Sequence, residues 1–192
     1  MDITPTSLPG VLIVDLRTFR DDRGFFVERY HEEKFRQLGL PVNWVQDNHA
    51  RSRRGVLRGL HYQLPRPQGK LVSCLSGTIF DVAVDIRVGS PTLAKWVGVE
   101  LSGDAPRLLW VPEGFAHGYV VLSDSADVSY KCTELYVPSA DRGVRWNDAD
   151  IGIDWPVKEP VLSPKDLALP SLRDAKSQLP RYDAPAAMTS AR

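Results

Sequence analysis

The sequence predicts an all-β protein, built as a sandwich, a jelly roll or a barrel. Runs rich in β-branched and aromatic residues recur along the chain, and Gly, Pro, Asp and Ser separate them at short intervals. Signals for strands outnumber those for helices. Strands of this kind need a second sheet against which to bury a face. With 192 residues and 43% hydrophobic content, the chain is long enough to bury one sizeable core.

The expected elements follow in chain order. Strands are predicted in the segments VLIVDLRTF, RGFFVERY, KLVSCLSGTIFDVAVDIR, KWVGVEL, RLLWVP, GYVVLS and DVSYKCTELYV. One helix is predicted over residues 31–38, because its composition favours a helix and Gly39 and Pro41 supply a stop. After Val137 the prolines break any long element, and we expect this segment to wrap the barrel with a helical turn at 165–167.

The domain organisation is predicted to be simple. Residues 1–183 form one domain, and residues 184–192 form a disordered tail because they have little to bury. The 24 basic and 24 acidic side chains balance without a long block of one sign, so no nucleic-acid or membrane partner is expected. A local group of arginines, Arg51, Arg53, Arg54 and Arg58, suits either a compact anion such as pyrophosphate or a solvated surface.

The cysteines and the N-terminus indicate the compartment. Cys74 and Cys132 lie in strand-like runs, where a free cysteine behaves as a small buried hydrophobe. The N-terminus lacks the basic region and apolar stretch of a secretory signal. A reduced, cytoplasmic location is therefore expected.

Two histidines stand in unusual contexts, His61 in GVLRGLHYQ and His117 in PEGFAHGYVVLSD. Residues 112–117, with Pro, Gly and His at spaced positions, resemble the second metal-ligand motif of cupins. The first cupin motif needs two histidines one residue apart, but Gln63 stands where the second would be. A metal centre is therefore disfavoured, and the histidines are free for proton transfer.

Several segments in order resemble one family, the dTDP-4-dehydrorhamnose 3,5-epimerases. The resemblance runs from about Ser7 to Leu172, and its segments are DDRGFFVERY, VQDNHARSRRGVLRGLHYQ, KLVSCLSGTIFDVAVDIR, VPEGFAHGYVVLSD, YKCTELYVPSADRGVRWND and LSPKD. The resemblance implies a homodimeric, cupin-type jelly-roll β-barrel with a few short helices. Its cavity would bind a dTDP-linked 4-keto-6-deoxy hexose, and no cofactor would be needed.

The implied chemistry needs an acid and a base. A C4 ketone acidifies the hydrogens on C3 and C5, so inversion requires a base on one face of the ring and an acid on the other. The resemblance assigns the base to His61, the acid to Tyr130 and the carboxylate that orients the base to Asp166. It places Lys70 beside the developing C4 oxyanion. The implied product of dTDP-4-dehydro-6-deoxy-D-glucose is dTDP-4-dehydro-L-rhamnose.

The resemblance also implies a set of residues that bind the nucleotide sugar. They are Arg23, Glu28, Gln46, Asp47, Asn48, Arg58, His117, Tyr136 and Lys165. Asp141 stands where the family tends to have a longer glutamate, and it is left out of the predicted site.

Strand parity supports one pair of residues and complicates another. Tyr130 and Tyr136 are an even number of residues apart, so a regular strand would point both rings to one face. Arg58 and His61 are an odd number apart, and a bulge at Gly59 would be needed to turn both inward.

Each site residue also has an ordinary structural explanation. Tyr130 alone would be a core aromatic, His61 a satisfied buried histidine, and Lys70 and Arg58 solvated charges on strand edges. Asp166 could serve only as a helix N-terminal charge, and Arg23 only as part of a turn. Three other functions stay open: a mono-epimerase acting at C3 or C5 only, a metal-dependent cupin, and a non-catalytic barrel that binds nucleotide sugars.

Overall fold

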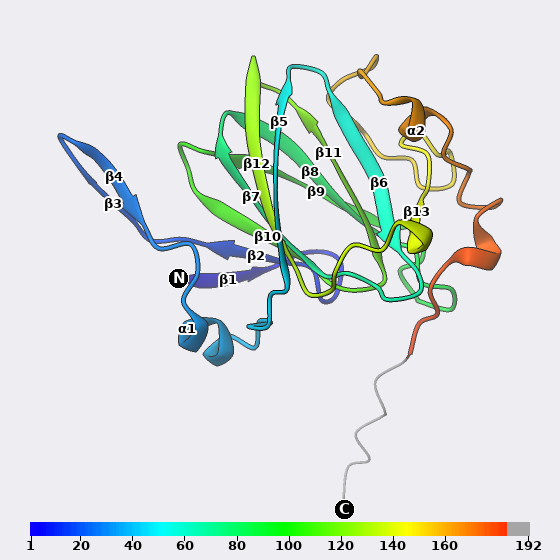
Figure 1. Cartoon of the computed structure of the whole chain (residues 1–192), viewed down its shortest axis with the longest axis horizontal. Helices are drawn as coiled ribbons and strands as arrows, with labels where there is room; N and C mark the ends of the chain where they lie inside the picture. Colours follow the sequence, from blue (N-terminus) through cyan, green and yellow to red (C-terminus); the bar gives the residue numbers. More distant parts are fainter. Residues whose placement is uncertain (184–192) are drawn as a thin grey trace, which may run out of the picture.

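Two antiparallel β-sheets face each other in the computed structural model, which describes residues 1–183 (Figure 1). The predicted disordered tail, residues 184–192, lies outside the described residues. The six-stranded sheet contains, in spatial order, β1 (Asp2–Pro5), β2 (Leu12–Asp15), β10 (Arg107–Val111), β7 (Lys70–Ser76), β12 (Ser125–Cys132) and β5 (Gln46–Arg53). The five-stranded sheet contains β13 (Asp141–Gly143), β6 (Leu57–Gln63), β11 (Phe115–Val121), β8 (Thr78–Asp85) and β9 (Trp96–Ser102).

The predicted all-β jelly roll is confirmed, with one refinement. Hydrogen bonds do not join the two sheets into a closed barrel over the described residues, so the architecture is a jelly-roll sandwich. Among residues 1–183, no helix is long and apolar enough to cross a membrane.

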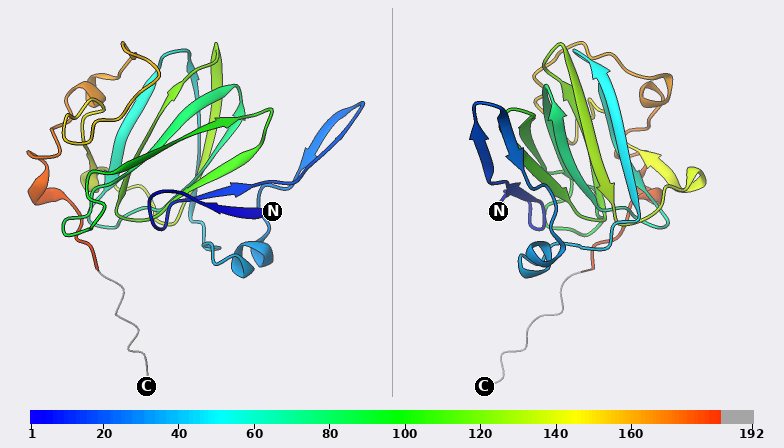
Figure 2. Two further views of the ribbon diagram at one scale, coloured as in Figure 1. Left: turned by 180° about the vertical axis from the view of Figure 1, so that it is seen from behind. Right: turned by 60° about the vertical axis from the view of Figure 1, so that its left-hand side comes forward.

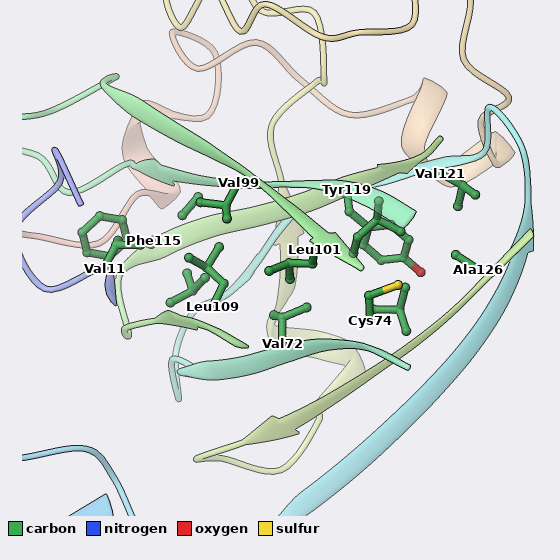
Figure 3. Packing of buried hydrophobic residues seen from close by; sticks show 14 of the residues in the cluster. Val11, Val72, Cys74, Val99, Leu101, Leu109, Phe115, Tyr119, Val121 and Ala126 are labelled. Carbon is green, nitrogen blue, oxygen red and sulfur yellow. The ribbon is translucent and has the colours of Figure 1, made fainter. Parts of the chain in front are cut away.

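One apolar cluster fills much of the space between the sheets (Figure 3). Because side chains alternate along a strand, each strand sends every second residue inward. Val72 and Leu109 from one sheet meet Leu101 and Phe115 from the other, and each is almost completely buried. Burying a side chain of this size contributes about 1.5–3 kcal/mol. This cluster fixes the two sheets as a rigid frame for the polar groups beside it.

Other parts of the chain cover the outer face of the five-stranded sheet and part of the outer face of the six-stranded sheet. The segment after Gly143 packs on the five-stranded sheet, with Ile151, Trp155 and Leu172 in a second apolar cluster (Figure 2). It includes the short helix α2 (Pro164–Leu167), as the sequence predicts. The other helix, α1 (Glu32–Gln37), buries Phe35 against the six-stranded sheet and ends before Gly39, close to the predicted bounds.

One hairpin leaves the body of the molecule. Strands β3 (Thr18–Asp21) and β4 (Gly24–Val27) pair only with each other and project away from both sheets (Figure 1). Phe19 and Phe26 on this hairpin are 51% and 69% exposed. Large apolar side chains on a projecting element mark a surface that is suited to contact with another molecule.

Several element boundaries differ from the sequence prediction. The long run over residues 70–87 is two strands, β7 and β8, which turn at Gly77 with a φ of 76°. Strand β12 ends at Cys132 and does not continue to Val137. Four strands, β1, β5, β6 and β13, have no counterpart among the predicted segments. Strand β5 gives no strand signal because its sequence, QDNHARSR, is polar apart from Ala50. Its inner face borders a polar site, so the usual apolar alternation is missing.

Candidate active site

A pocket of about 310 Å³ opens between the two sheets. Strands β5, β7 and β12 of one sheet and β6 and β13 of the other contribute to its walls. The side chains that line it are those of Gln46, Asn48, His61, Tyr62, Gln63, Gln68, Lys70, Tyr130, Tyr136, Asp141 and Lys165. The structure thus brings together seven residues of the predicted site, namely His61, Lys70, Tyr130, Gln46, Asn48, Tyr136 and Lys165.

A histidine–aspartate pair forms one side of this pocket. His61 Nε2 donates to Asp166 Oδ1 at 2.5 Å. The carboxylate is held from behind, because the Ser163 hydroxyl donates to Asp166 Oδ2 at 2.8 Å and the Ser163 oxygen caps α2. Burial raises the pKa of Asp166, but hydrogen bonds from His61 and Ser163 and the charge of His61 outweigh it and leave the pKa below its usual value. A carboxylate held in this way fixes the histidine tautomer and leaves Nδ1 as the free nitrogen.

A bulge turns His61 and Arg58 to the same side of β6. His61 lies opposite His117, and Arg58 lies opposite Tyr119. Between these pairs β6 has two residues, Gly59 and Leu60, where β11 has only Gly118. Gly59, between them, has a φ of 135°, and a Cβ there would lie 2.6 Å from the Cα of Gly118. Only glycine fits this position. The bulge that the sequence predicted is therefore present.

Lys70 is buried in the pocket wall at the start of β7, with only 9% of the residue exposed. Burial lowers the pKa of this ammonium group, and the charge of Lys165 acts in the same direction. The neighbouring Cys132, Asp141 and Asp81 oppose that decrease. In its protonated form, the buried Lys70 can stabilise a negative charge that develops in the pocket.

Tyr130 faces His61 from the other sheet. It lies on β12, in register with Asn48 of β5 and Val72 of β7. Burial raises the pKa of Tyr130, while the charge of Arg58 acts in the opposite direction, so the phenol keeps its proton at neutral pH. A ligand between the sheets would therefore meet a basic imidazole on one side and a phenolic proton donor on the other.

A second histidine–aspartate pair lies deeper in the sandwich. His117 Nε2 donates to Asp81 Oδ1 at 2.7 Å, and both side chains are almost fully buried. His117 does not line the pocket itself, although it lies opposite His61 in the sheet. Arg58 does not line the pocket either. Its Nε donates to Ser52 Oγ of β5, in the other sheet, at 3.1 Å.

The rim of the pocket contains a linked group of three side chains. Asp141 accepts hydrogen bonds from the Tyr136 hydroxyl, at 2.8 Å, and from the Lys165 ammonium group. Burial raises the pKa of Asp141, but these two hydrogen bonds and nearby positive charge reduce it below its usual value. Tyr136 reaches the pocket from the loop after β12 and not from the strand itself. Tyr136 therefore lies at the site as predicted, but it is on a loop and not on the same strand as Tyr130.

Four lining residues were missed in the sequence: Tyr62, Gln63, Gln68 and Asp141. Asp141 stands where the family tends to have a longer glutamate, and it still reaches the pocket rim, where it bonds to Tyr136 and Lys165. In the sequence, Gln63 is distinguished only because it stands where a cupin metal site needs its second histidine. No sequence signal singled out Tyr62 or Gln68.

Three predicted binding residues lie away from the pocket of their own chain. Arg23 is at the tip of the projecting hairpin, 90% exposed and paired with Asp21. Glu28 pairs with Lys34 at the base of that hairpin. Alternation along β5 turns Asp47 to the outer face, where it pairs with Lys131.

The residues present do not form a metal-binding cluster within the described part of the chain, where no three His, Cys, Asp or Glu side chains gather suitably. Gln63 uses its amide in hydrogen bonds to the backbone of Arg66, Leu135 and Val137.

The fold and the pocket define a cupin-type jelly-roll protein with an acid–base site between its sheets. A family model described as dTDP-4-dehydrorhamnose 3,5-epimerase matches residues 5–174. Similar proteins include the dTDP-4-dehydrorhamnose 3,5-epimerase of Shigella flexneri, 53% identical over 87% of this chain and 93% of that protein. The dTDP-4-dehydrorhamnose 3-epimerase of Streptomyces niveus is 39% identical over 95% of this chain and 90% of that protein.

A solved structure gives the same result. The dTDP-6-deoxy-D-glucose-3,5-epimerase of Legionella pneumophila Philadelphia 1, in complex with dTDP-4-keto-L-rhamnose, is 48% identical with a TM-score of 0.92. The match covers 95% of this chain and 99% of that one. The chain belongs to the dTDP-4-dehydrorhamnose 3,5-epimerase family, and it is an isomerase.

Proposed function

We propose that the chain converts dTDP-4-dehydro-6-deoxy-D-glucose into dTDP-4-dehydro-L-rhamnose by inverting C3 and C5, as a step of dTDP-rhamnose biosynthesis. The observation that carries the proposal is the arrangement of three groups around one pocket. A histidine held by a carboxylate lies on one sheet, a protonated tyrosine lies on the facing sheet, and a buried lysine lies in the wall. Relatives named for this activity are about half identical to the chain.

The reaction follows from the properties of these groups. His61 Nδ1 takes a proton from the carbon beside the ketone, and the electron pair of the broken C–H bond moves into an enolate with its charge on the C4 oxygen. The ammonium group of Lys70 stabilises that charge in a site with little water. Tyr130 then donates its proton to the carbon from the opposite face, and the C4 ketone forms again. Before the second inversion, His61 releases its proton to solvent and Tyr130 regains one from solvent, which restores the base and the acid. Repetition at the second carbon then gives the doubly inverted product, and no external electron acceptor is needed.

The substrate-binding roles are proposed in the same way. Tyr136 would stack on the nucleotide, and Gln46, Asn48 and Lys165 would contact it through hydrogen bonds. Arg58 would act from the edge of the pocket through its charge. His117 lies deeper, opposite His61, and would support the sugar site without lining the pocket. A basic group such as Arg58 suits the pyrophosphate.

A homodimer is proposed because two of the predicted binding residues are remote from their own pocket. Arg23 and Glu28 lie on or beside the projecting hairpin, whose phenylalanines are exposed. Docking of this hairpin on a second copy would bury those rings and bring both charged residues to the neighbouring site. We also propose that residues 1–183 act as one domain. The cytoplasmic location stays a prediction from the sequence.

The experiment is turnover of dTDP-4-dehydro-6-deoxy-D-glucose by purified, chelator-treated protein without added cofactor. A downstream reductase traps the product, whose sugar is identified by NMR. A rhamno-configured sugar supports the proposal, and a sugar inverted at C3 alone would instead assign the mono-epimerase activity named for the Streptomyces niveus relative. Binding without any turnover would assign a non-catalytic nucleotide-sugar protein. His61→Ala is the matched control, and it should be inactive while still binding dTDP.

A further inference from the structure

The segment Glu134–Val137 carries Tyr136 to the rim of the pocket, although it belongs to neither sheet. It follows β12 and precedes β13, and its backbone has no strand partner (Figure 1). The ends of the connection are fixed by backbone hydrogen bonds, from Thr133 to Gly69 and from Leu64 to Ala140. Between these ends the peptide groups need other partners, because unpaired backbone groups are costly.

Three glutamine side chains supply four of those partners, and the Glu134 carboxylate accepts from the Leu135 N–H at 2.8 Å. Gln63 Oε1 accepts from the Val137 N–H at 2.8 Å, and its Nε2 donates to the Leu135 carbonyl at 3.1 Å. Gln46 Oε1 accepts from the Tyr136 N–H at 2.7 Å, and Gln68 Nε2 donates to the Glu134 carbonyl at 2.7 Å. The segment is therefore held by side chains from β5, β6 and the connection before β7.

Gln63 is the centre of this arrangement. Its side chain is buried, with only 4% of the residue exposed. The other hydrogen on Nε2 is donated to the Arg66 carbonyl. Both amide hydrogens and the amide oxygen are thus used. A glutamate would lose the donors, and a neutral histidine offers one donor and one acceptor only. The chemistry at residue 63 therefore requires a primary amide.

We propose that Gln63 is a positioning residue that, together with Gln46 and Gln68, holds Glu134–Val137 so that Tyr136 is preorganised for the nucleotide. The proposal rests on the function proposed above and extends it to a residue that touches no reacting atom. Tyr136 itself is half exposed, so packing alone does not fix its backbone. A preorganised aromatic ring binds its ligand more tightly because less order has to be created on binding.

The test combines amide hydrogen exchange with a double-mutant cycle on dTDP binding. Gln63→Met keeps the volume of the side chain and removes its hydrogen bonds. The Val137 and Tyr136 amides should then exchange at least ten-fold faster, and the Kd for dTDP should rise about ten-fold, or about 1.4 kcal/mol. In a Tyr136→Ala background the same substitution should change Kd less than two-fold. KM should rise more than kcat falls, whereas Gln37→Met, on the exposed face of α1, should alter none of these values.

Two results would overturn the proposal: unchanged amide exchange in Gln63→Met, or a loss of dTDP affinity that persists in full when Tyr136 is absent. The amide measurement needs no nucleotide, so it tests the backbone contacts independently of dTDP binding. If the wild type failed to bind dTDP, that result would refute the proposed function and not the role of Gln63 in holding the backbone. If Gln63→Met does not fold, Gln68→Met removes one bond to the same segment and enters the same cycle, with a smaller effect in the same direction.

Discussion

Replacing Asp166 by Asn tests the histidine–aspartate pair with little change in shape. The asparagine can keep its oxygen toward His61 and its amide toward the Ser163 oxygen, which would still cap α2. What disappears is the negative charge that faces His61 Nε2 at 2.5 Å. The substitution therefore removes support for the imidazolium that forms when His61 takes a proton.

The expected magnitude follows from that one contact. A hydrogen bond to a charged group contributes about 1.5–3 kcal/mol, which corresponds to a fall in kcat of about 10- to 150-fold. Rotation of the amide would stabilise the wrong tautomer and make the loss larger. Binding of dTDP should stay within two-fold, because Asp166 lies behind His61 and does not line the pocket.

The assay is the rate at which solvent deuterium enters the sugar at C3 and C5, measured beside the Kd for dTDP. Asp150→Asn is the matched control, since this aspartate lies in the same covering segment and pairs with Arg173 at the surface. Full exchange activity in Asp166→Asn would refute the role given to the pair. Loss of dTDP binding in proportion to activity would show that Asp166 supports the fold and not the base.

Three further substitutions test the other parts of the site. Tyr130→Phe should retain deuterium exchange, because His61 still removes the proton, but inverted product should fall at least ten-fold in the trapping assay. Lys70→Met should abolish turnover but raise Tm at pH 7. Burial lowers the pKa of Lys70, so a positive charge held there costs stability, and methionine removes that cost. Each kcal/mol of stability gained corresponds to an increase in Tm of about 2–4 °C. The Tm difference between variant and wild type should shrink as pH rises through the lowered pKa, because the wild-type lysine becomes neutral there. Wild-type activity should fall over the same pH range. A Tm difference that does not depend on pH would contradict the role given to Lys70. Gly59→Ala should destabilise by about 2–4 kcal/mol in a denaturant titration, because its Cβ meets Gly118 at a positive φ, whereas Gly55→Ala has open space and should lose less.

The sequence was informative where chemistry depends on residue type and local spacing. The bulge at Gly59 could be predicted because Arg58 and His61 are an odd number of residues apart, and only an extra residue turns both inward. His61, Lys70 and Tyr130 could be assigned together because the resemblance fixes all three at once. Their contact with one pocket is a property of the two facing sheets. The strand pattern predicts such packing in general, but the predicted segments do not include β6, which carries His61.

Other features depend on contacts between distant segments. The end of β12 at Cys132 could not be read from DVSYKCTELYV, since the residues after it remain strand-like in composition. Beyond Cys132 the backbone bonds to side-chain amides of residues 46, 63 and 68 and not to a neighbouring strand. Similarly, no local pattern places Arg23 on a hairpin that leaves the body of its own chain.

The most direct test of the account is to follow the C3 and C5 protons of dTDP-4-dehydro-6-deoxy-D-glucose by NMR in deuterated water, with wild type and with His61→Ala. If His61 is the single base for both carbons, the wild type exchanges both protons and the variant loses both exchanges together while it still binds dTDP. Exchange at one carbon only in the wild type, or exchange that survives in His61→Ala, would contradict the account.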